Sequence, residues 1–406
     1  METLRIAHVD LIPKLNGGHV AIANIVKALA NKGHEVHLVR GTSEKNERDS
    51  EEVDKSTGAR FFIHYVVGPK TVLNMPRAFK TAARKLEDFD SKTRFDIINA
   101  HAAGAFAVML SRQKDIESRL IVTLHGHQLY RALMLASDLV RFRQSLLQVG
   151  FVENVAVNFS GAFLYFGLEV MASRRAVYTT VPSEFDRTLM LRMHLVDEER
   201  IVAVPNCIET HSGFSSREQA KEELKLASSQ VILFSGPLIP LKGVHYLLKA
   251  MKQVNKKVPS AKLVLAGEGM LQSQALKRDS PSSDEKVICL GWVPHEMMHK
   301  FYAAADLLAH PSLYESCSLT IAEALSLGVP VVAFNTAAIP EYISDGKTGL
   351  LAELGNSDDL AKKMINILQD ENLAEKLGKN GKEFASNTFS PKAVAGKMEE
   401  VYKHVK

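Results

Sequence analysis

The sequence predicts an α/β protein made of two Rossmann-like, doubly wound domains, and three observations predict it. Short apolar segments alternate along the chain with segments of helical periodicity, which is typical of strand–helix–strand units and parallel sheets. The chain has 406 residues, which fits two medium-sized domains, and 46% of them are hydrophobic, enough for two sizeable cores. A polar, glycine-containing stretch at 210–216 separates the two alternating series and is a plausible hinge.

The overall composition excludes several classes of protein. The formal net charge is only +4, which does not indicate a nucleic-acid partner, and we expect none. Three scattered cysteines, Cys207, Cys289 and Cys317, do not fit a disulfide framework or a zinc site. Residues 1–30 lack the pattern of a signal peptide. We therefore expect a cytoplasmic protein.

The first domain opens with a strand, a glycine loop, a helix and a second strand. The strands are expected at 4–9 and 36–40, and apolar residues at i, i+3, i+4 and i+7 predict a helix over 20–31. Gly17 and Gly18 let backbone approach a ligand at the N-terminus of this helix. The loop lacks the G-x-G-x-x-G dinucleotide fingerprint, and the alternative for Gly17 and Gly18 is a tight structural turn.

The remainder of the first domain continues the alternation. Residues 43–56 are charged and polar and are expected to form an exposed loop. A helix is expected over 77–92, and further strands are expected at 61–67, 96–100, 120–124, 176–181 and 201–204. Asp88 and Asp90 form an Asp-x-Asp pair, but metal-binding carboxylates belong on a loop after a buried strand, and this pair lies in a charged helix end. We expect no metal there.

Two histidines end successive buried strands. His101 follows the strand at 96–100, and His125 follows the strand at 120–124. A lone histidine is usually structural, but side chains at the carboxyl ends of parallel strands lie where such sheets bind ligands. A histidine beside a substrate hydroxyl can orient it or relay a proton. His125 is therefore our catalytic candidate in this domain, with His127 as the fallback.

Residues 129–175 are the hardest to interpret. The segment 155–172 is strongly apolar and is marginal in length for a membrane span. Three interpretations remain: a helix buried against the sheet, an aromatic acceptor surface or membrane-contact helix flanked by arginines, and a spanning helix. The second makes peripheral contact with a membrane one hypothesis for this chain.

The second domain contains two carboxylates around a strand-to-helix turn. A buried strand is expected at 306–310 and a helix at 319–327, with Glu315 before the helix and Glu323 inside it, eight residues apart. The amides of Ser318, Leu319 and Thr320 open this helix and could face an anion. The alternative is that both glutamates are solvated surface charges. Further strands are expected at 230–235, 261–266, 286–290 and 331–334, with helices from 244, at 358–369, 372–386 and 391–404.

The stretch that begins at Glu315 resembles a known family signature. Glu315 and Glu323 are followed by Gly-Val-Pro-Val-Val at 328–332 and Ile-Pro-Glu at 339–341. This order resembles the donor-site signature of retaining glycosyltransferases of the two-Rossmann-domain architecture (the GT-B fold), in particular glycosyltransferase family 4. Gly-His-Glu-Val at 33–36 also matches that family.

The resemblance implies a domain plan. Residues 1–208 would form an acceptor-binding domain, 209–228 a linker region, and 229–390 a nucleotide-sugar-binding domain facing the first across a cleft. The helix within 391–406 would cross back onto the first domain.

The resemblance also implies roles for particular residues. Lys242 would grip the donor diphosphate, Glu323 the ribose and Glu315 the donor sugar, so the catalytic set is His125, Lys242 and Glu315. The loop containing Val293 resembles the one whose backbone reads the nucleobase, although simple turn chemistry explains it as well. Further donor contacts are expected from Gly17, Gly18, Ser316, Cys317, Ser318, Leu319 and Thr320.

This sequence departs from the family at three places. Pro237 stands where the family has an arginine, so one of two charge-assisted phosphate contacts is missing. The residues Ser316, Cys317 and Ser318 replace Gly-Phe-Gly, which makes close approach of the donor harder. Cys207 replaces a glycine, so left-handed backbone there would be strained.

The resemblance implies a retaining, metal-independent transfer of a hexosyl group from a nucleoside-diphosphate sugar to the hydroxyl of a saccharide or lipid-linked acceptor, without a cofactor. Two alternatives remain. One is a catalytically silent sugar-nucleotide-binding protein of the same fold, which the missing arginine favours. The other is an epimerase or phosphorylase on this architecture. A lipid-linked acceptor would place the protein at the inner face of a membrane.

Overall fold

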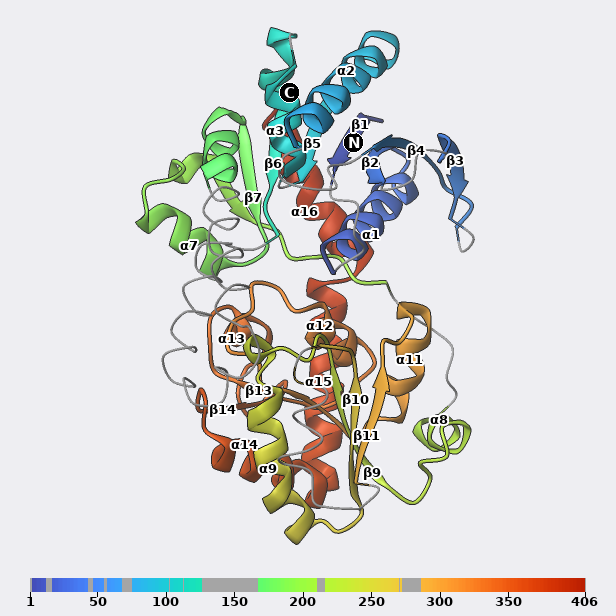
Figure 1. Ribbon diagram of the computed structural model, residues 1–406, viewed down its shortest axis with the longest axis vertical. Helices are drawn as coiled ribbons and strands as arrows, with labels where there is room; N and C mark the ends of the chain where they lie inside the picture. Colours follow the sequence, from blue (N-terminus) through green and yellow to red (C-terminus); the bar gives the residue numbers. More distant parts are fainter. Residues whose placement is uncertain are drawn as a thin grey trace. The chain divides into compact units, whose positions relative to one another are not determined.

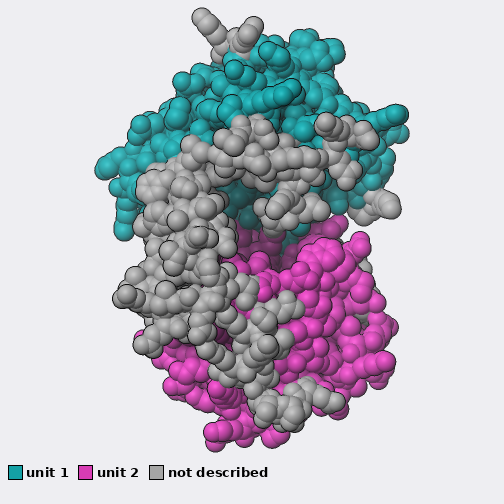
Figure 2. All heavy atoms as spheres, in the orientation of Figure 1, with its two compact units in different colours: residues 1–132, 150–208, 391–406 teal, residues 133–149, 209–390 magenta. Residues whose placement is uncertain are grey.

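The computed structural model describes residues 2–11, 17–42, 47–54, 57–67, 75–101, 103–111, 113–125, 167–209, 216–269, 271 and 286–405. They fall into two compact units, which Figure 2 shows in different colours. The first unit holds the described residues up to Ile208 together with Pro391–Lys406, and the second holds those from Glu209 to Ser390. Each unit is built around its own largely parallel sheet, as the sequence predicts.

In the described part of the first unit, the sheet has the strand order β3-β4-β2-β1-β5-β6-β7-β8 (Figure 1). All neighbouring strands are parallel except β3 and β4. The strands are β1 (Arg5–Asp10), β2 (Glu35–Thr42), β3 (Ser50–Val53), β4 (Arg60–Val67), β5 (Ile97–His101), β6 (Leu120–Thr123), β7 (Tyr178–Val181) and β8 (Ile201–Ala203). The helices are α1 (Gly17–Asn31), α2 (Met75–Thr93), α3 (Ala103–Met109), α7 (Glu184–Arg192) and α16 (Pro391–Lys403).

The expectation of an exposed loop over 43–56 is wrong at β3. Ser50–Val53 pairs antiparallel with β4 at the edge of the sheet, although three of its four residues are exposed. A charged sequence suits an edge strand, because charge discourages pairing with another chain. An edge strand can pair through its backbone without burying its side chains, so the polar composition of residues 50–53 did not predict this strand.

The C-terminal helix α16 packs against α1 in the first unit (Figure 1), which confirms the prediction that the chain crosses back. Tyr402 is fully buried, and its hydroxyl accepts a hydrogen bond of 3.3 Å from Asn99 Nδ2 on β5. Glu399 accepts hydrogen bonds from Lys32 and, at 3.0 Å, from His34 Nε2. His34 in the Gly-His-Glu-Val stretch thus anchors this helix.

Asp90, at the end of α2, has a structural role. Its two carboxylate oxygens each accept a hydrogen bond of 2.8 Å from the Arg119 guanidinium, and Oδ1 also accepts one of 2.9 Å from the Phe95 amide. The bidentate pair is largely buried. Asp88 instead accepts a hydrogen bond from Lys92 at 2.7 Å. The two carboxylates of the Asp-x-Asp pair therefore serve separate contacts.

In the described part of the second unit, a parallel sheet has the order β11-β10-β9-β12-β13-β14, the strand order of a Rossmann fold. Its strands are β9 (Gln230–Ser235), β10 (Ala261–Ala266), β11 (Val287–Gly291), β12 (Leu307–His310), β13 (Val331–Phe334) and β14 (Leu350–Ala352). Its helices are α8 (Arg217–Glu223), α9 (Val244–Lys257), α11 (His295–Ala304), α12 (Leu319–Ser326), α13 (Ile339–Tyr342), α14 (Ser357–Gln369) and α15 (Glu371–Thr388).

Helix α8 lies within the segment expected as a linker. Lys221 on this helix forms an ion pair of 2.7 Å with Asp306, next to β12, and Arg217 pairs with the same carboxylate at 3.5 Å. These contacts attach the helix to the second unit. The hinge expected at 210–216 lies outside the described residues except for Ser216, which caps α8 by accepting a hydrogen bond from the Gln219 amide.

The backbone at Cys207 is not in a strained conformation. Cys207 does not have a positive φ angle, so the replacement of the family glycine costs no backbone strain, and its side chain is buried. The apolar segment 155–172 lies outside the described residues up to 166, and residues 167–175 are helical. Among the helices that the structure describes, none is both long and apolar enough to cross a membrane.

Candidate functional site

In the second unit, β9 and β12 lie side by side at the point where the strand order reverses, and the loops that follow them are in contact. The Leu313 amide donates a hydrogen bond of 2.9 Å to the Leu241 carbonyl. Gly243 has a φ of 68°, and a Cβ there would lie 1.8 Å from the carbonyl oxygen of Pro311. Only glycine fits this close approach. The sequence thus brings the loop that carries Lys242 against the loop that carries Glu315.

Lys242, His310 and Glu315 form a compact charged cluster. Glu315 Oε1 lies 2.5 Å from Lys242 Nζ and 2.8 Å from His310 Nε2, and both nitrogens donate to it. Burial alone would raise the Glu315 pKa, but the Lys242 charge and the His310 hydrogen bond outweigh it and hold the pKa well below its usual range. Glu315 is therefore ionised, and the cluster keeps a cation at the carboxyl end of the sheet.

The N-terminus of α12 directly follows the loop that carries Glu315. Ser318 caps the helix, because its Oγ accepts a hydrogen bond of 3.3 Å from the Ile321 amide. The carbonyl of Ser316 accepts a hydrogen bond of 2.5 Å from the Tyr342 hydroxyl, which fixes the turn. The structure thus places Ser316, Cys317 and Ser318 on the turn and makes Leu319 and Thr320 the first two residues of α12, beside Glu315.

Glu323 lies one turn inside α12 and is held by two side chains that the sequence analysis did not identify. Oε1 lies 2.8 Å from His295 Nε2, and Oε2 accepts a hydrogen bond of 2.9 Å from the Tyr302 hydroxyl. Burial, and then the Glu323 charge, raise the Tyr302 pKa well above its usual range, so the phenol remains a donor. His295 and Tyr302 are both on α11, a helix that the sequence analysis did not predict.

The loop after β11 supplies an exposed aromatic side chain. Trp292 is 70% exposed, and its amide donates a hydrogen bond of 3.2 Å to Glu268 Oε1. Val293, the residue expected near the nucleobase, follows it and is half-buried. On the loop after β9, Pro237 is exposed, so Lys242 is the one cationic side chain of residues 236–243.

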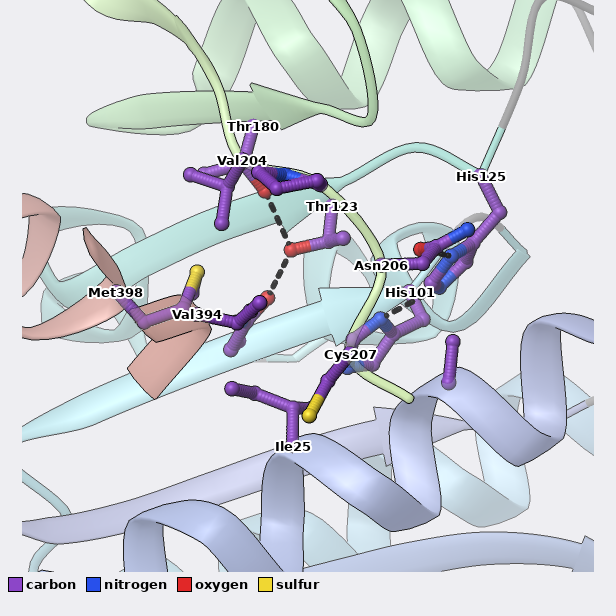
Figure 3. Close-up of a pocket in the computed structure, with 13 residues that line it drawn as sticks. Ile25, His101, Thr123, His125, Thr180, Val204, Asn206, Cys207, Val394 and Met398 are labelled. Carbon is purple, nitrogen blue, oxygen red and sulfur yellow. Dashed lines mark hydrogen bonds between the residues drawn. The ribbon is translucent and has the colours of Figure 1, made fainter. Parts of the chain in front are cut away.

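The first unit carries a row of imidazoles at its own sheet reversal, between β1 and β5. His8 Nδ1 lies 2.9 Å from His101 Nε2, and His101 Nδ1 lies 3.0 Å from His125 Nε2. His125 Nδ1 lies 3.4 Å from Asn206 Oδ1, and Figure 3 shows His101, His125 and Asn206 together at one side of a pocket. The sequence predicted His101 and His125 at strand ends, but His8, inside β1, was missed.

The pocket is small, with room for a water-sized group, and lies among β5, β6, β7, α1 and α16 (Figure 3). One wall is hydroxyl-bearing, because Thr123 Oγ1 lies 2.7 Å from both Asn99 Oδ1 and Thr180 Oγ1. The opposite wall is apolar and includes Ile25, Val394, Met398 and Cys207. The surface exposed in the pocket is mostly apolar, and the hydroxyls of Thr123 and Thr180 are hydrogen-bonded to each other.

The imidazoles are neutral near pH 7. Desolvation lowers the pKa of His8 to about 3, with a smaller contribution from His125. Desolvation likewise lowers the pKa of His125 to about 4, although the hydrogen bond to Asn206 opposes the shift. The pKa of His101 lies well below its usual range for the same main reason.

Gly17 and Gly18 are the first two residues of α1, whereas the sequence analysis placed them in the loop before a helix that begins at residue 20. The next residue, His19, is buried and forms an ion pair of 3.1 Å with buried Asp10 at the end of β1, which the sequence analysis missed. The fallback candidate His127 lies outside the described residues.

Two protein-family models match the chain. The model "Glycosyltransferase Family 4" matches residues 15–212, and "Glycosyl transferases group 1" matches residues 215–384. The chain is 26% identical over 398 residues to N-acetyl-alpha-D-glucosaminyl L-malate synthase of Bacillus anthracis, covering 96% of this chain and 94% of that protein. The matches therefore extend over nearly the whole sequence.

Solved structures with the same fold are also glycosyltransferases or sugar-nucleotide complexes. Sucrose-phosphate synthase from Thermosynechococcus elongatus is similar with a TM-score of 0.77 and 19% identity, covering 99% of each chain. Anabaena HepE in complex with UDP-glucose is similar with a TM-score of 0.69 and 19% identity, covering 98% of this chain and 99% of that one. The chain belongs to the group 1 glycosyltransferases of family 4 and has the GT-B fold.

Proposed function

We propose that this glycosyltransferase moves a hexosyl group from a nucleoside-diphosphate sugar to an acceptor hydroxyl, with retention of anomeric configuration and without a metal or cofactor. The observation that carries the proposal is the cluster of Lys242, His310 and Glu315 at the sheet reversal of the second unit. Open α/β sheets bind ligands at such reversals. A sugar nucleotide also needs a cation where its diphosphate leaves.

Each part of the cluster has a chemical use in this reaction. Lys242 neutralises charge that develops on the leaving diphosphate, the kind of contribution that is largest in water-poor sites. The N-terminus of α12 adds aligned amides, worth up to about 2 kcal/mol when partly buried. Glu315 is ionised and suits the hydroxyls of the donor sugar, while Glu323, oriented by Tyr302, suits the ribose. No carboxylate in this arrangement must act as a covalent nucleophile, which favours front-face attack.

The acceptor would bind in the first unit. The pocket beside His125 and Asn206 has room for a water-sized group, so a saccharide or the head of a lipid-linked acceptor would place one hydroxyl there. A lipid-linked acceptor would bring the protein to the inner membrane face as a peripheral protein. Flotation with anionic vesicles tests that part, and absence of binding would leave the soluble saccharide as the acceptor.

A thermal-shift screen tests the donor. UDP, GDP, ADP and their common sugar conjugates are compared with and without EDTA. A ligand present at 100 times its dissociation constant should add about 2.7 kcal/mol of stability. We expect one nucleotide and its sugar conjugates to raise the melting temperature equally with and without EDTA. An activity assay with the sugar conjugate that binds should then show glycosyl transfer. A shift that EDTA abolishes would contradict metal independence, and binding without turnover would contradict the transferase.

A further inference from the structure

The three imidazoles of the first unit form one continuous hydrogen-bonded chain from the pocket into the core. Its links are His8 to His101, His101 to His125 and His125 to Asn206, with lengths of 2.9, 3.0 and 3.4 Å. Within the described part of the chain, the inner end, His8 Nε2, is buried and has no hydrogen-bond partner. A neutral imidazole has one donor and one acceptor nitrogen, so the whole chain must run in one direction.

The two ends determine that direction. Asn206 presents its Oδ1, an acceptor, so His125 Nδ1 carries the proton and His125 Nε2 is an acceptor. His101 must then donate from Nδ1 and His8 must donate from Nδ1, which leaves His8 Nε2 as a bare lone pair. The opposite direction would need an amide donor from Asn206 and would bury an N–H at His8 Nε2 without an acceptor. A buried donor without a partner is the rarer and costlier defect.

We propose that Asn206, His101 and His8 hold His125 as the neutral Nδ1–H tautomer, so that His125 serves glycosyl transfer as a hydrogen-bond donor to a substrate oxygen and not as a base. The inference rests on the proposed function and deepens it. His101 and His8 are positioning residues, because they act on the substrate only through His125.

The geometry also indicates where the substrate oxygen binds. His125 Nε2 is occupied by His101, whereas Nδ1 meets Asn206 across the longest link of the chain, at 3.4 Å. A long, poorly formed hydrogen bond is easily exchanged for a better acceptor. A sugar hydroxyl or ring oxygen entering the pocket would take the place of Asn206 Oδ1 and receive the same proton. The group bound at this position is therefore a hydrogen-bond acceptor, such as a sugar oxygen.

The surroundings keep the proton in this position. Desolvation lowers the His125 pKa to about 4, so the ring does not gain a second proton near pH 7. Two further titratable groups, His19 and Asp10, are paired with each other at 3.1 Å beside the end of β1. The interaction with His19 lowers the pKa of both His101 and His125, and so opposes protonation of these two imidazoles.

Nuclear magnetic resonance of the full chain, labelled with ¹⁵N in histidine only, reads the tautomer directly. The signals of His125 are assigned by comparison with the His125→Phe variant, in which they are absent. We expect His125, His101 and His8 all to be neutral and protonated at Nδ1. A proton on His125 Nε2, or a doubly protonated ring at pH 7, would overturn the inference.

Variants of His101 test the positioning role. His101→Phe keeps a ring in the stack but removes the donor to His125 Nε2, so the tautomer should become mixed and kcat should fall roughly 10- to 100-fold, the range for groups that orient a functional histidine. His101→Gln can donate from its amide and should restore the Nδ1–H tautomer and most of kcat. Equal losses in both variants, with an unchanged tautomer, would contradict the inference.

A third variant keeps the test valid if His101→Phe does not fold. His8→Phe removes the donor to His101 Nε2, so His101 should no longer be fixed at Nδ1–H and the His125 tautomer should become mixed. An unchanged His125 tautomer in this variant would contradict a role for His8. The failure of the inference can be distinguished from failure of the proposed function. An Nε2–H tautomer in an active transferase refutes only the inference, whereas the expected tautomer in a protein without sugar-nucleotide turnover refutes the proposed function.

Discussion

The two units place different chemistry at the same position of the same fold. In each, the strand order reverses between two neighbouring strands, and polar side chains of these strands or of the loops after them are in contact there. The second unit joins Lys242 to the ionised Glu315, whereas the first joins His8 to His101, both neutral near pH 7. Fold therefore determines where functional groups gather, and the local residues determine whether they carry charge.

The difference fits the two parts of the reaction proposed above. A departing diphosphate gains negative charge, so a fixed cation stabilises it, whereas an acceptor hydroxyl is neutral until late in transfer and is best oriented by neutral donors and acceptors. The comparison predicts that the charged site is sensitive to loss of charge and the imidazole chain to acid. Four experiments test it, from the largest expected effect to the smallest.

Lys242→Met should have the largest effect. It removes the cation but keeps the length of the side chain, so kcat/KM with the sugar nucleotide should fall about 10²- to 10³-fold, as for loss of one strong transition-state contact. Lys249→Met, at an exposed position of α9, is the matched control and should be neutral. Similar activity in the two variants would remove the charged site from the mechanism.

Acid should destabilise the first unit before the second. The pKa values of His8 and His125 are about 3 and 4 in the fold against 6.5 unfolded, so the unfolded state binds more protons below pH 6.5. Each imidazole then costs roughly 2 kcal/mol at pH 5. Glu315 has a lowered pKa, so its contribution is present above the unfolded value of about 4.3 and is lost only below it.

Hydrogen exchange followed by mass spectrometry measures the loss of stability in acid for each unit within the intact chain. Between pH 7 and pH 5, after correction for intrinsic exchange rates, protection should fall in β1, β5 and β6 and hold in β9 and β12. Equal loss in both sheets would refute the contrast between neutral and charged sites.

Pro237→Arg should strengthen the charged site. The exposed loop after β9 has room for a second cation, and a hydrogen bond to a charged group contributes about 1.5–3 kcal/mol, so affinity for the nucleoside diphosphate should rise at least tenfold. Pro237→Gln separates charge from loss of the proline ring. If the glutamine variant gains as much as the arginine variant, backbone freedom and not charge is the cause.

His295→Ala should have the smallest effect. His295 occupies Glu323 Oε1, so its removal frees one oxygen for the ribose. The ion pair is partly exposed, and such pairs contribute about 0.2–1 kcal/mol, so nucleotide affinity should rise by at most about fivefold. A 2′-deoxynucleotide is the control, and an equal gain for it would show that Glu323 does not read the ribose.

Much of the fold was predictable because buried parallel strands are continuous apolar runs, as at β12 and β13. The edge strand β3 could not be predicted in this way, because an edge strand needs no apolar face. Glu315 and Lys242 were found by motif, but their direct contact depends on Gly243 and Pro311, which come together only in the fold. His8 and Tyr302 were missed for the same reason. Each has a hydrogen-bond partner that lies far away in the sequence.

Calorimetric titration with UDP-glucose in EDTA tests the central claim most directly, with UDP, GDP, ADP and their sugar conjugates as further ligands. The wild-type chain and the Lys242→Met and His125→Phe variants are compared. We predict metal-free binding of one sugar nucleotide, at least tenfold weaker in Lys242→Met and changed far less in His125→Phe. Binding that requires a metal, or that Lys242→Met leaves unchanged, would contradict a donor site built on the charged cluster of the second unit.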